Sequence, residues 1–463
     1  MKRYFLGAFC LLVFFTICRF SSGSQPVLTT KTSKQQKPNI IWIITEDISP
    51  ELGCYGYQQV QTPNLDALAK EGTRYNNMYV TGSVCSISRS ALITGMYQTT
   101  IGAHNHRSHQ DDGYILPAPV KPITEFLAAA GYYRVLAEMT PNGIKPTEHL
   151  DYNFNWSNKY FDGHHWNDRK SGQPFFAEIH VSVTHRGPIW KTAVQKHQPQ
   201  IDPDKLRLPV YYPDHPVARE DWATYLESIQ LMDSYVGNFL ERLDKEDLTK
   251  NTVVMFFSDH GRCHVRDKQF VYDGGIHIPF IIRWPAGTTH PPIDNELHSS
   301  IDIAATTLRL AGIKPPSYME GIPFVGPGVK KREFVIAAKD RMDETIDKMR
   351  AVRTLQFKYI KNYYPERPYM QPNKYKETEY PVWNLMKQLY SSGKLTPEQA
   401  LFCAPTKPAE ELYDIQSDPD ELHNLASSPA YSPTLKEMRS ILDKWIKKTR
   451  DKGQYPENKS SKR

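Results

Sequence analysis

The sequence PNIIWIITED, from Pro38 to Asp47, sets the architecture of this chain. Up to Thr45 it is a short apolar run rich in β-branched side chains, which is typical of a parallel strand buried on both faces. The run ends in Glu46 and Asp47, and the carboxyl end of a buried strand is where open α/β sheets place their functional sites. The alternative is that these two carboxylates have no special role and are simply solvated at the end of the strand.

A second buried strand has a similar end. The run TVVMFFS at 252–258 is followed by Asp259 and His260. If the two strands are neighbours in a parallel sheet, Asp259 and His260 converge with Glu46 and Asp47. Carboxylate oxygens with few nitrogens suit a hard cation, so we expect Ca²⁺ first and Mg²⁺ or Mn²⁺ next.

Apolar strands and helices follow one another as far as residue 329. In the longest predicted helix, 221–244, apolar side chains recur every three or four positions and form a core-facing stripe. This alternation predicts an α/β fold with a large, mostly parallel or mixed sheet flanked by helices. Further strands are predicted over 73–80, 173–183 and 280–284, and further helices over 62–72, 123–130 and 301–311.

From about residue 330 the pattern changes to short alternating strands, predicted over 334–338 and 351–360. A loop rich in Tyr and Pro follows at 363–380, and a helix is predicted over 432–448. We therefore expect two domains, a catalytic domain at 38–329 and a smaller α+β domain with an antiparallel sheet at 330–463.

Residues 1–24 have the features of a signal peptide. Two basic residues precede an apolar run at 6–17 that is too short to span a bilayer comfortably, and small residues follow it. Cys18 offers a lipoprotein anchor as the alternative, although the residue before it fits that signal poorly. After a polar linker at 25–37 no apolar run is long enough for a stable membrane span, so we expect a secreted or periplasmic protein.

Length, charge and cysteine count narrow the class of protein further. A chain of 463 residues is too long for one ordinary core. The formal net charge of +6 is spread along the chain, which does not indicate nucleic-acid binding. Without the signal peptide, Cys54, Cys85, Cys263 and Cys403 remain, too few for a disulfide framework.

The stretch VCSISRSALITG at 84–95 places Cys85 four residues before Arg89, with a Thr-Gly turn behind. A helix predicted at 89–96 aims its amino-terminal amides at the cysteine and favours an anion there. The stretch resembles the signature of the formylglycine-dependent (type I) sulfatases of the alkaline-phosphatase-like superfamily. The resemblance implies that a maturation enzyme oxidises Cys85 to the aldehyde formylglycine (3-oxoalanine), whose hydrate attacks sulfur. Ile87 departs from the Pro or Ala of the family.

Other motifs resemble the same family in the same order. The sequence KQFVYDGGIHIP at 268–279 is similar to the family's Lys-x-x-x-Tyr-Glu-Gly-Gly-x-Arg-x-Pro, which implies that Lys268 binds the sulfate oxygens. Thr-His at 184–185 resembles the Pro-His element, so His185 is expected to protonate the leaving alcohol. The resemblance also adds Cys85 to the cation ligands, and it implies that Arg89 stabilises the hydrated aldehyde.

Two further features depart from the family. Glu46 stands where the family has Asp, and the family's Lys-x-His element, expected within 132–151, is missing. A cluster of His and Arg at 104–107 follows the nucleophile segment; it suits a sulfate or carboxylate, or forms only a surface turn. The candidates for substrate binding are His104, His106, Arg107, Lys145, His149 and His277.

The resemblance implies a sulfatase that acts on a sulfated oligo- or polysaccharide. A sulfamidase, which removes N-sulfate, is a variant that the same core allows. Two alternatives remain: a hydrolase of phosphate or phosphonate esters, and a degenerate homologue that only binds sulfated glycan, which Ile87 and the missing Lys-x-His element favour. Algal polysaccharides and glycosaminoglycans both remain open as substrates.

Overall fold

The computed structural model describes Met1 and residues 37–110, 112–148, 150–156, 158–187, 190–191, 194–195, 200–326, 328–451 and 453. The predicted signal peptide, apart from Met1, and the linker before Lys37 lie outside the described residues, as does His149. The chain divides after Gln36, and the unit that begins at Lys37 contains both β-sheets.

The central strand of the main sheet is β1 (Asn39–Thr45), which lies between β5 (Phe175–Val181) and β6 (Thr252–Ser258) and runs parallel to both. All residues of the three strands are buried, as their β-branched and aromatic composition predicts. Trp42 packs edge-on against Phe176 and Phe257, one ring on each neighbouring strand. Thr45 pairs with Ser258, so β1 and β6 end at the same edge.

Eight strands form this sheet in the order β4-β3-β5-β1-β6-β7-β2-β8. β3 pairs with β5 in parallel, whereas β7 is antiparallel to both β6 and β2. The sheet is therefore mixed, which agrees with the prediction. The remaining strands are β2 (Thr73–Tyr79), β3 (Tyr133–Thr140), β4 (Gly143–Pro146), β7 (His277–Arg283) and β8 (Ile293–Ser299).

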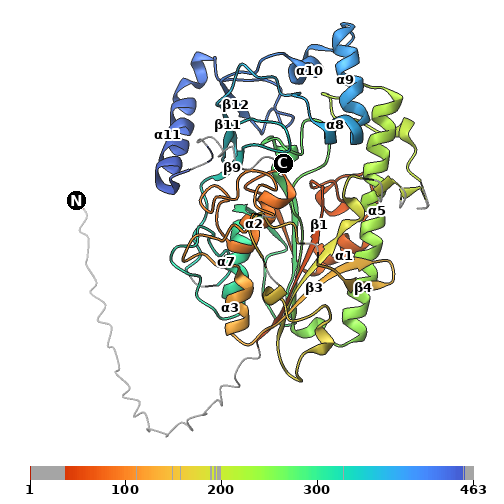
Figure 1. The fold of residues 1–463 in the computed structure, drawn as a ribbon, viewed down its shortest axis with the longest axis vertical. Coiled ribbons are helices and arrows are strands. Elements are labelled where there is room, and N and C mark those ends of the chain that lie inside the picture. The colour runs from red at the N-terminus through yellow and green to blue at the C-terminus, as the bar shows by residue number, and fades with distance from the viewer. Residues whose placement is uncertain are drawn as a thin grey trace. The chain divides into compact units, whose positions relative to one another are not determined.

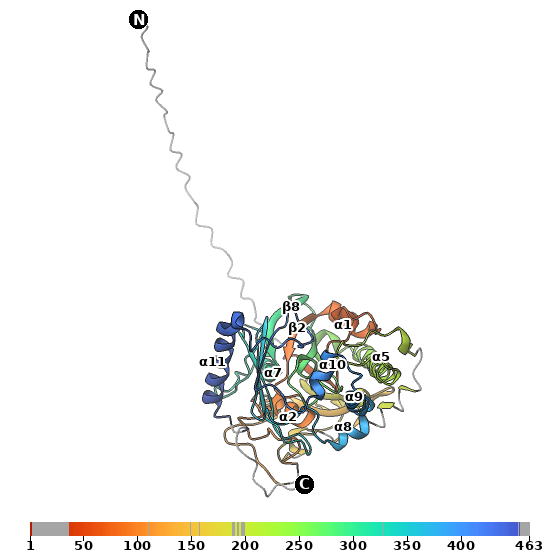
Figure 2. The ribbon, with the colours of Figure 1, turned by 90° about the horizontal axis from the view of Figure 1, so that it is seen from above.

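Helices cover both faces of the sheet (Figures 1 and 2). On one face α2 (Cys85–Thr94), α3 (Ile123–Ala129) and α7 (Ile301–Leu310) pack together, and on the other α1 (Pro63–Glu71) packs against α5 (Pro216–Lys245). The predicted stripe of α5 is buried from Tyr225 to Leu243, which confirms it as core. A short helix, α6 (Asp273–Ile276), precedes β7.

A second, antiparallel sheet has the order β12-β11-β10-β9. Its strands are β9 (Val335–Lys339), β10 (Met349–Arg353), β11 (Phe357–Asn362) and β12 (Glu410–Asp414), and α11 (Ser432–Thr449) packs against β10 and β11. Between β11 and β12 lie α8 (Lys374–Glu379), α9 (Pro381–Ser391) and α10 (Pro397–Ala400). The two sheets confirm the predicted fold class, and the domain boundary at 329/330 stays a prediction.

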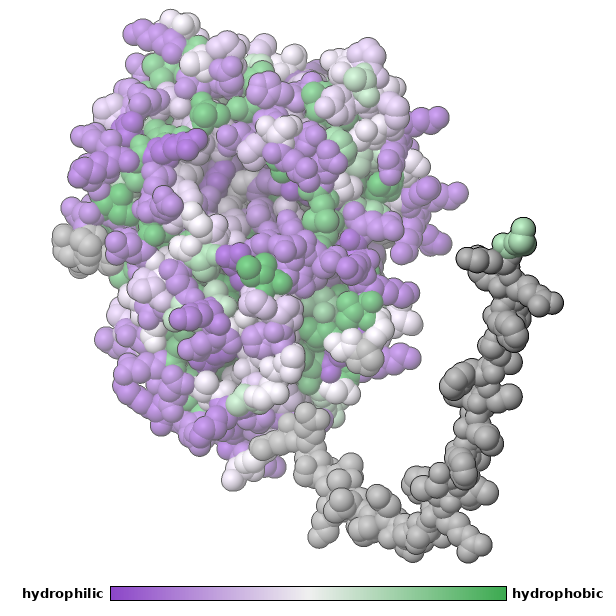
Figure 3. Space-filling model, turned by 180° about the vertical axis from the view of Figure 1, so that it is seen from behind, coloured by the Kyte–Doolittle hydropathy of each residue, from purple (hydrophilic) through white to green (hydrophobic). Residues whose placement is uncertain are grey.

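The surface drawn in Figure 3 is mostly hydrophilic, with hydrophobic residues scattered over it. Ile115 and Leu355 are among the large hydrophobic side chains that are exposed, and single apolar residues are normal on a protein surface. Among the described residues, no helix is both long and apolar enough to cross a bilayer.

Candidate functional site

The candidate site lies where β1 and β6 end. Because these strands are parallel neighbours in register, the segments that follow them leave the sheet side by side, and Asp259 N donates to Thr45 O at 3.0 Å. The structure therefore brings Glu46 and Asp47 next to Asp259 and His260, as the two strand ends predicted.

Asp47 is fully buried and lies at the centre of the group, with a left-handed backbone (φ 60°) that Asp tolerates better than most residues. Its Oδ1 lies 2.8 Å from Lys268 Nζ and 3.2 Å from His260 Nε2, while Oδ2 accepts from Arg186 N at 2.9 Å. Burial alone raises the pKa of this carboxyl, but the neighbouring Lys268 and His260 charges outweigh it and hold the pKa well below its usual range.

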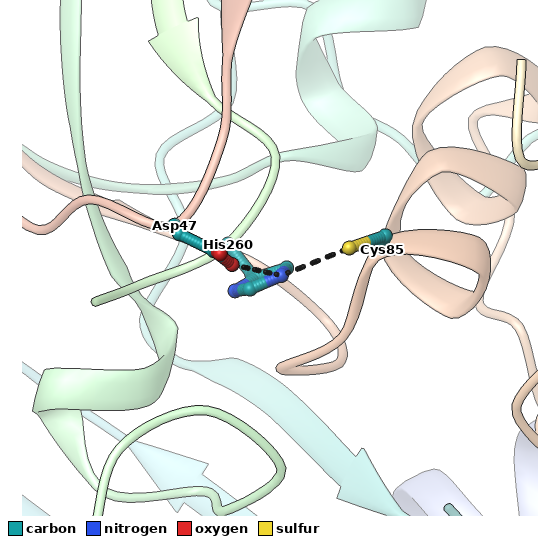
Figure 4. A group of neighbouring side chains, drawn as sticks. All are labelled: Asp47, Cys85 and His260. Carbon is teal, nitrogen blue, oxygen red and sulfur yellow. Dashed lines mark hydrogen bonds and ion pairs between the residues drawn. The ribbon is translucent and has the colours of Figure 1, made fainter. Parts of the chain in front are cut away.

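Cys85 is the first residue of α2 and is 5 % exposed. Its Sγ lies 3.3 Å from His260 Nε2 and 3.8 Å from Lys268 Nζ. Burial raises the pKa of the thiol, yet the Lys268 charge and the histidines bring it below its ordinary value overall. Figure 4 shows Asp47, Cys85 and His260 meeting from three separate segments, and their ligand atoms lie within 4.8 Å of one another.

Arg89 lies one helical turn after Cys85 and is 2 % exposed. Its guanidinium contacts Asp259 Oδ2 through Nε at 3.1 Å and Glu46 Oε1 through Nη2 at 3.1 Å. The third nitrogen, Nη1, lies 3.2 Å from His180 Nε2. One side chain thus joins the ends of β1, β6 and β5, a task that the rigid fork of arginine suits better than lysine.

His185 and Lys268 flank the thiol. His185 is 39 % exposed in its side chain, and its Nε2 lies 3.9 Å from Glu46 Oε2. Burial lowers the pKa of His185, but the Glu46 charge and a hydrogen bond to Cys85 raise it overall to about 9, so the imidazole carries a proton to donate near neutral pH. Lys268 is buried and stays charged, because the Asp47 and Cys85 charges outweigh its burial and raise its pKa.

The His and Arg cluster after α2 lies beside the nucleophile segment. His106 Nδ1 lies 2.8 Å from Ser86 Oγ, which in turn accepts from Arg107 N at 3.1 Å. Arg107 binds Asp151 with two nitrogens, each at 3.0 Å. Burial lowers the pKa of His106 to about 4, so its imidazole is uncharged at neutral pH.

The other candidates for substrate binding have different surroundings. Lys145 lies on β4, is 55 % exposed and pairs with Glu138 at 3.0 Å. His277 stacks on Tyr79, and its Nε2 lies 2.9 Å from Asn76 O on β2. His104 is partly buried, and burial lowers its pKa. The roles of these residues stay predictions.

Glu178 and His180 on β5 were not predicted as site residues. His180 Nε2 lies 2.8 Å from Glu178 Oε1, and Tyr152 OH donates to Glu178 Oε2 at 3.0 Å. Glu178 is 1 % and His180 3 % exposed, and they support Arg89 from behind. The sequence does carry a signal for them, because two ionisable residues that lie two positions apart share one face of an otherwise apolar strand.

Ile87, which departs from the family motif, is fully buried and packs against Val84 and Met342. A Cβ on Gly82 would lie only 2.7 Å from the Ile87 methyl group, so the backbone of Gly82 makes the space that the larger side chain needs. The folded protein accommodates this departure without disturbing the start of α2.

Comparison with known proteins agrees with this geometry. The model of the sulfatase family matches residues 38–313, and a second model, "N-sulphoglucosamine sulphohydrolase, C-terminal", matches residues 261–371. An "Ulvan-active sulfatase" of Formosa agariphila is 35 % identical over 475 residues, covering 93 % of this chain and 78 % of that protein.

Two solved structures share the fold. A putative sulfatase from Bacteroides thetaiotaomicron has a TM-score of 0.66 at 20 % identity, covering 92 % of this chain and 96 % of that one. The phosphonate monoester hydrolase of Agrobacterium radiobacter has a TM-score of 0.65 at 16 % identity, covering 90 % and 97 %. Since the family model spans more than half of the chain and the ulvan-active relative nearly all of it, this protein belongs to the sulfatase family and is a sulfatase.

Proposed function

We propose that this sulfatase removes sulfate from a sulfated polysaccharide or its oligosaccharides. The observation that carries the proposal is the set of groups around Cys85: Lys268 and His260 contact its thiol, and His185 hydrogen-bonds to it. A buried thiol at the start of a helix, ringed by cationic groups, provides the environment that an anionic ester requires.

The nucleophile in this proposal is Cys85 after its oxidation to formylglycine, whose hydrated aldehyde supplies an oxygen that attacks sulfur. Cys85 fits this modification because its side chain is the first of α2 and faces Asp47 and His260 (Figure 4). A maturation enzyme that reads the segment before it folds is required, since Cys85 and all of α2 are buried in the folded chain.

A divalent cation is the second group that the proposal requires. Glu46, Asp47, Asp259, His260 and the residue at Cys85 would hold it: the ligand atoms of Asp47, Cys85 and His260 lie within 4.8 Å of one another, and Arg89 binds both Glu46 and Asp259. His260 Nδ1 lies 2.9 Å from Gly261 O and donates there, which leaves Nε2 facing the carboxylates. Such a cation withdraws charge from the sulfate oxygens. We favour Ca²⁺, with Mg²⁺ or Mn²⁺ as alternatives, because most of the donors are carboxylate oxygens.

The remaining tasks fall to side chains of the chain itself. Lys268 neutralises the sulfate oxygens, since its ammonium lies between Asp47 and Cys85. His185 carries the proton that the leaving sugar oxygen needs, and its 39 % exposure lets a substrate reach it. Arg89 holds the carboxylates of both strand ends in position.

The substrate class follows from the relative named for ulvan, a match that spans nearly the whole chain. The match of residues 261–371 to the sulphohydrolase model favours sulfamidase activity as the second candidate. The protein is exported in this proposal, through the predicted signal peptide at 1–24, and meets its substrate in the periplasm or outside the cell.

The test begins with the mass of the Cys85 peptide, from protein made with and without a co-expressed maturation enzyme. Sulfate release is then measured on ulvan fragments, on N- and O-sulfated glycosaminoglycan disaccharides, and on a phosphonate ester, with Cys85→Ala as the matched control. We expect formylglycine and O-sulfate release that stops with EDTA and returns with Ca²⁺. An unmodified thiol beside converted control proteins, or glycan binding without sulfate release, would contradict the proposal.

A further inference from the structure

A lysine in the carboxyl-terminal part of the chain is buried against the loop that carries Lys268. Lys376 lies on α8 and is 0 % exposed. Its Nζ donates to three backbone carbonyls, those of Lys268 at 2.7 Å, Val265 at 3.2 Å and His264 at 3.4 Å. An ammonium has three donors, and here all three meet carbonyls of one loop.

Aromatic rings surround the rest of this ammonium. It lies 4.7 Å from the ring centroid of Tyr380, 5.3 Å from that of Phe270 and 5.5 Å from that of Trp383. Burying a lysine is costly unless its charge is compensated; carbonyl dipoles and ring faces offset part of this cost, while burial lowers the pKa of Lys376 well below its usual value. A surface helix does not require such a residue, so its role lies in the loop that it binds.

The backbone on both sides of the Lys268 side chain is fixed. Lys268 N donates to Arg262 O at 3.1 Å, while its carbonyl accepts from Lys376. The next residue, Gln269, has a left-handed backbone (φ 74°) that a long side chain rarely adopts. Such a conformation persists only where neighbouring contacts enforce it, and Gln269 N donates to Ser83 O at 2.8 Å.

Helix α8 also contacts Lys268 and the backbone of Arg186 through Tyr375. The ring of Tyr375 lies 5.4 Å from Lys268 Nζ, and its hydroxyl donates to Arg186 O at 3.1 Å. Arg186 N in turn donates to Asp47. At the start of α8, Asn373 Oδ1 accepts from Lys376 N at 2.9 Å, which fixes the first turn that presents both side chains.

We propose that Lys376 is a positioning residue that holds the Lys268 ammonium between Asp47 and Cys85 by binding the carbonyls of the 264–268 loop. This inference rests on the proposed function of Lys268 in binding the sulfate oxygens. Lys376 itself touches neither the substrate nor the reacting atoms.

Two measurements test the inference. Hydrogen exchange of the 264–270 segment reports the loop directly, and kinetics of sulfate release report its consequence. The variants are Lys376→Met, which keeps an unbranched apolar side chain but removes the ammonium, and Lys374→Met, a matched control at an exposed position of the same helix. Asn373→Ala is the milder second variant, because it removes only the hydrogen bonds of the Asn373 side chain and leaves Lys376 in place.

We expect faster exchange at 264–270 in Lys376→Met and, to a smaller degree, in Asn373→Ala, with the control unchanged. We expect kcat to fall by about 10²-fold in Lys376→Met, as for misplacement of a catalytic group, with KM little changed because Lys268 acts mainly in the transition state. In a Lys268→Ala background the added effect of Lys376→Met should vanish, since a residue that acts only through Lys268 has nothing left to position.

Unchanged exchange at 264–270, or an equal loss of kcat with and without Lys268, overturns the inference. The exchange measurement does not depend on turnover. A chain that releases no sulfate therefore contradicts the proposed function, while the exchange of the 264–270 segment still decides whether Lys376 holds the loop.

Discussion

Arg89 joins the carboxylates of two strand ends, and replacing it with lysine tests this arrangement. The guanidinium contacts Asp259, Glu46 and His180 through three different nitrogens, at 3.1, 3.1 and 3.2 Å. A lysine ammonium is a single point and cannot span the same partners. Asp259 is 1 % and Glu46 6 % exposed, so water cannot replace the lost contacts.

The expected loss of stability follows from these contacts. Hydrogen bonds to charged groups contribute about 1.5–3 kcal/mol each. If Arg89→Lys keeps one of the two carboxylate contacts and leaves the other carboxylate buried and unpaired, the cost is roughly 3–5 kcal/mol, the range for breaking a buried ion pair. We expect the urea midpoint to fall accordingly, with the slope of the transition unchanged.

The assay uses protein made without the maturation enzyme, so that every molecule carries the Cys85 thiol, and EDTA excludes metal. Arg107→Lys is the matched control, because Arg107 is 46 % exposed and pairs with the single carboxylate of Asp151, so that a lysine ammonium can still reach this partner. Equal losses in the two variants would refute the reasoning, as would a loss below about 1 kcal/mol in Arg89→Lys.

Three further outcomes are expected. Lys268→Met should lower kcat/KM for sulfate release by roughly 10²–10³-fold, whereas Lys250→Met, at a lysine that is 77 % exposed, should leave it unchanged. His185→Asn should cost roughly 10²–10⁴-fold on a sugar sulfate and much less on 4-nitrophenyl sulfate, whose leaving group needs no proton; equal losses on both substrates would rule out a proton donor. Ile87→Ala should lower stability by about 2–5 kcal/mol through the cavity that it leaves, while the Cys85 peptide mass should show more formylglycine.

How well each strand or helix could be predicted from the sequence depended on how its buried and exposed residues alternate. The strand predicted at 252–258 matches β6 residue for residue, because an apolar β-branched run has few other uses. β8 was not predicted, since IDNELHS is polar and half exposed along its first residues. The helix predicted at 89–96 begins earlier, at Cys85, because all of α2 is buried and shows no amphipathic pattern to mark its start.

The residues of the candidate site could also be predicted only in part. Glu46, Asp47, Asp259 and His260 could be predicted to meet, because parallel neighbouring strands end at one edge of the sheet. The positions of Cys85, Arg89, His185 and Lys268 followed from motifs. Residues that act through others belong to no motif: Glu178 and His180 support Arg89 from β5, and Lys376 lies in a region predicted only as a loop rich in Tyr and Pro.

The supporting residues that belong to no motif also indicate how the two predicted domains depend on each other. Ile336 and Tyr359 of the second sheet share one apolar cluster with Ala91 of α2 and Ile301 of α7. The helix that carries Cys85 therefore has its outer side covered by residues beyond 330. Because α8 also binds the Lys268 loop and the Arg186 backbone, we expect the proposed catalytic groups of residues 38–329 to acquire their geometry only when residues beyond 330 are in place.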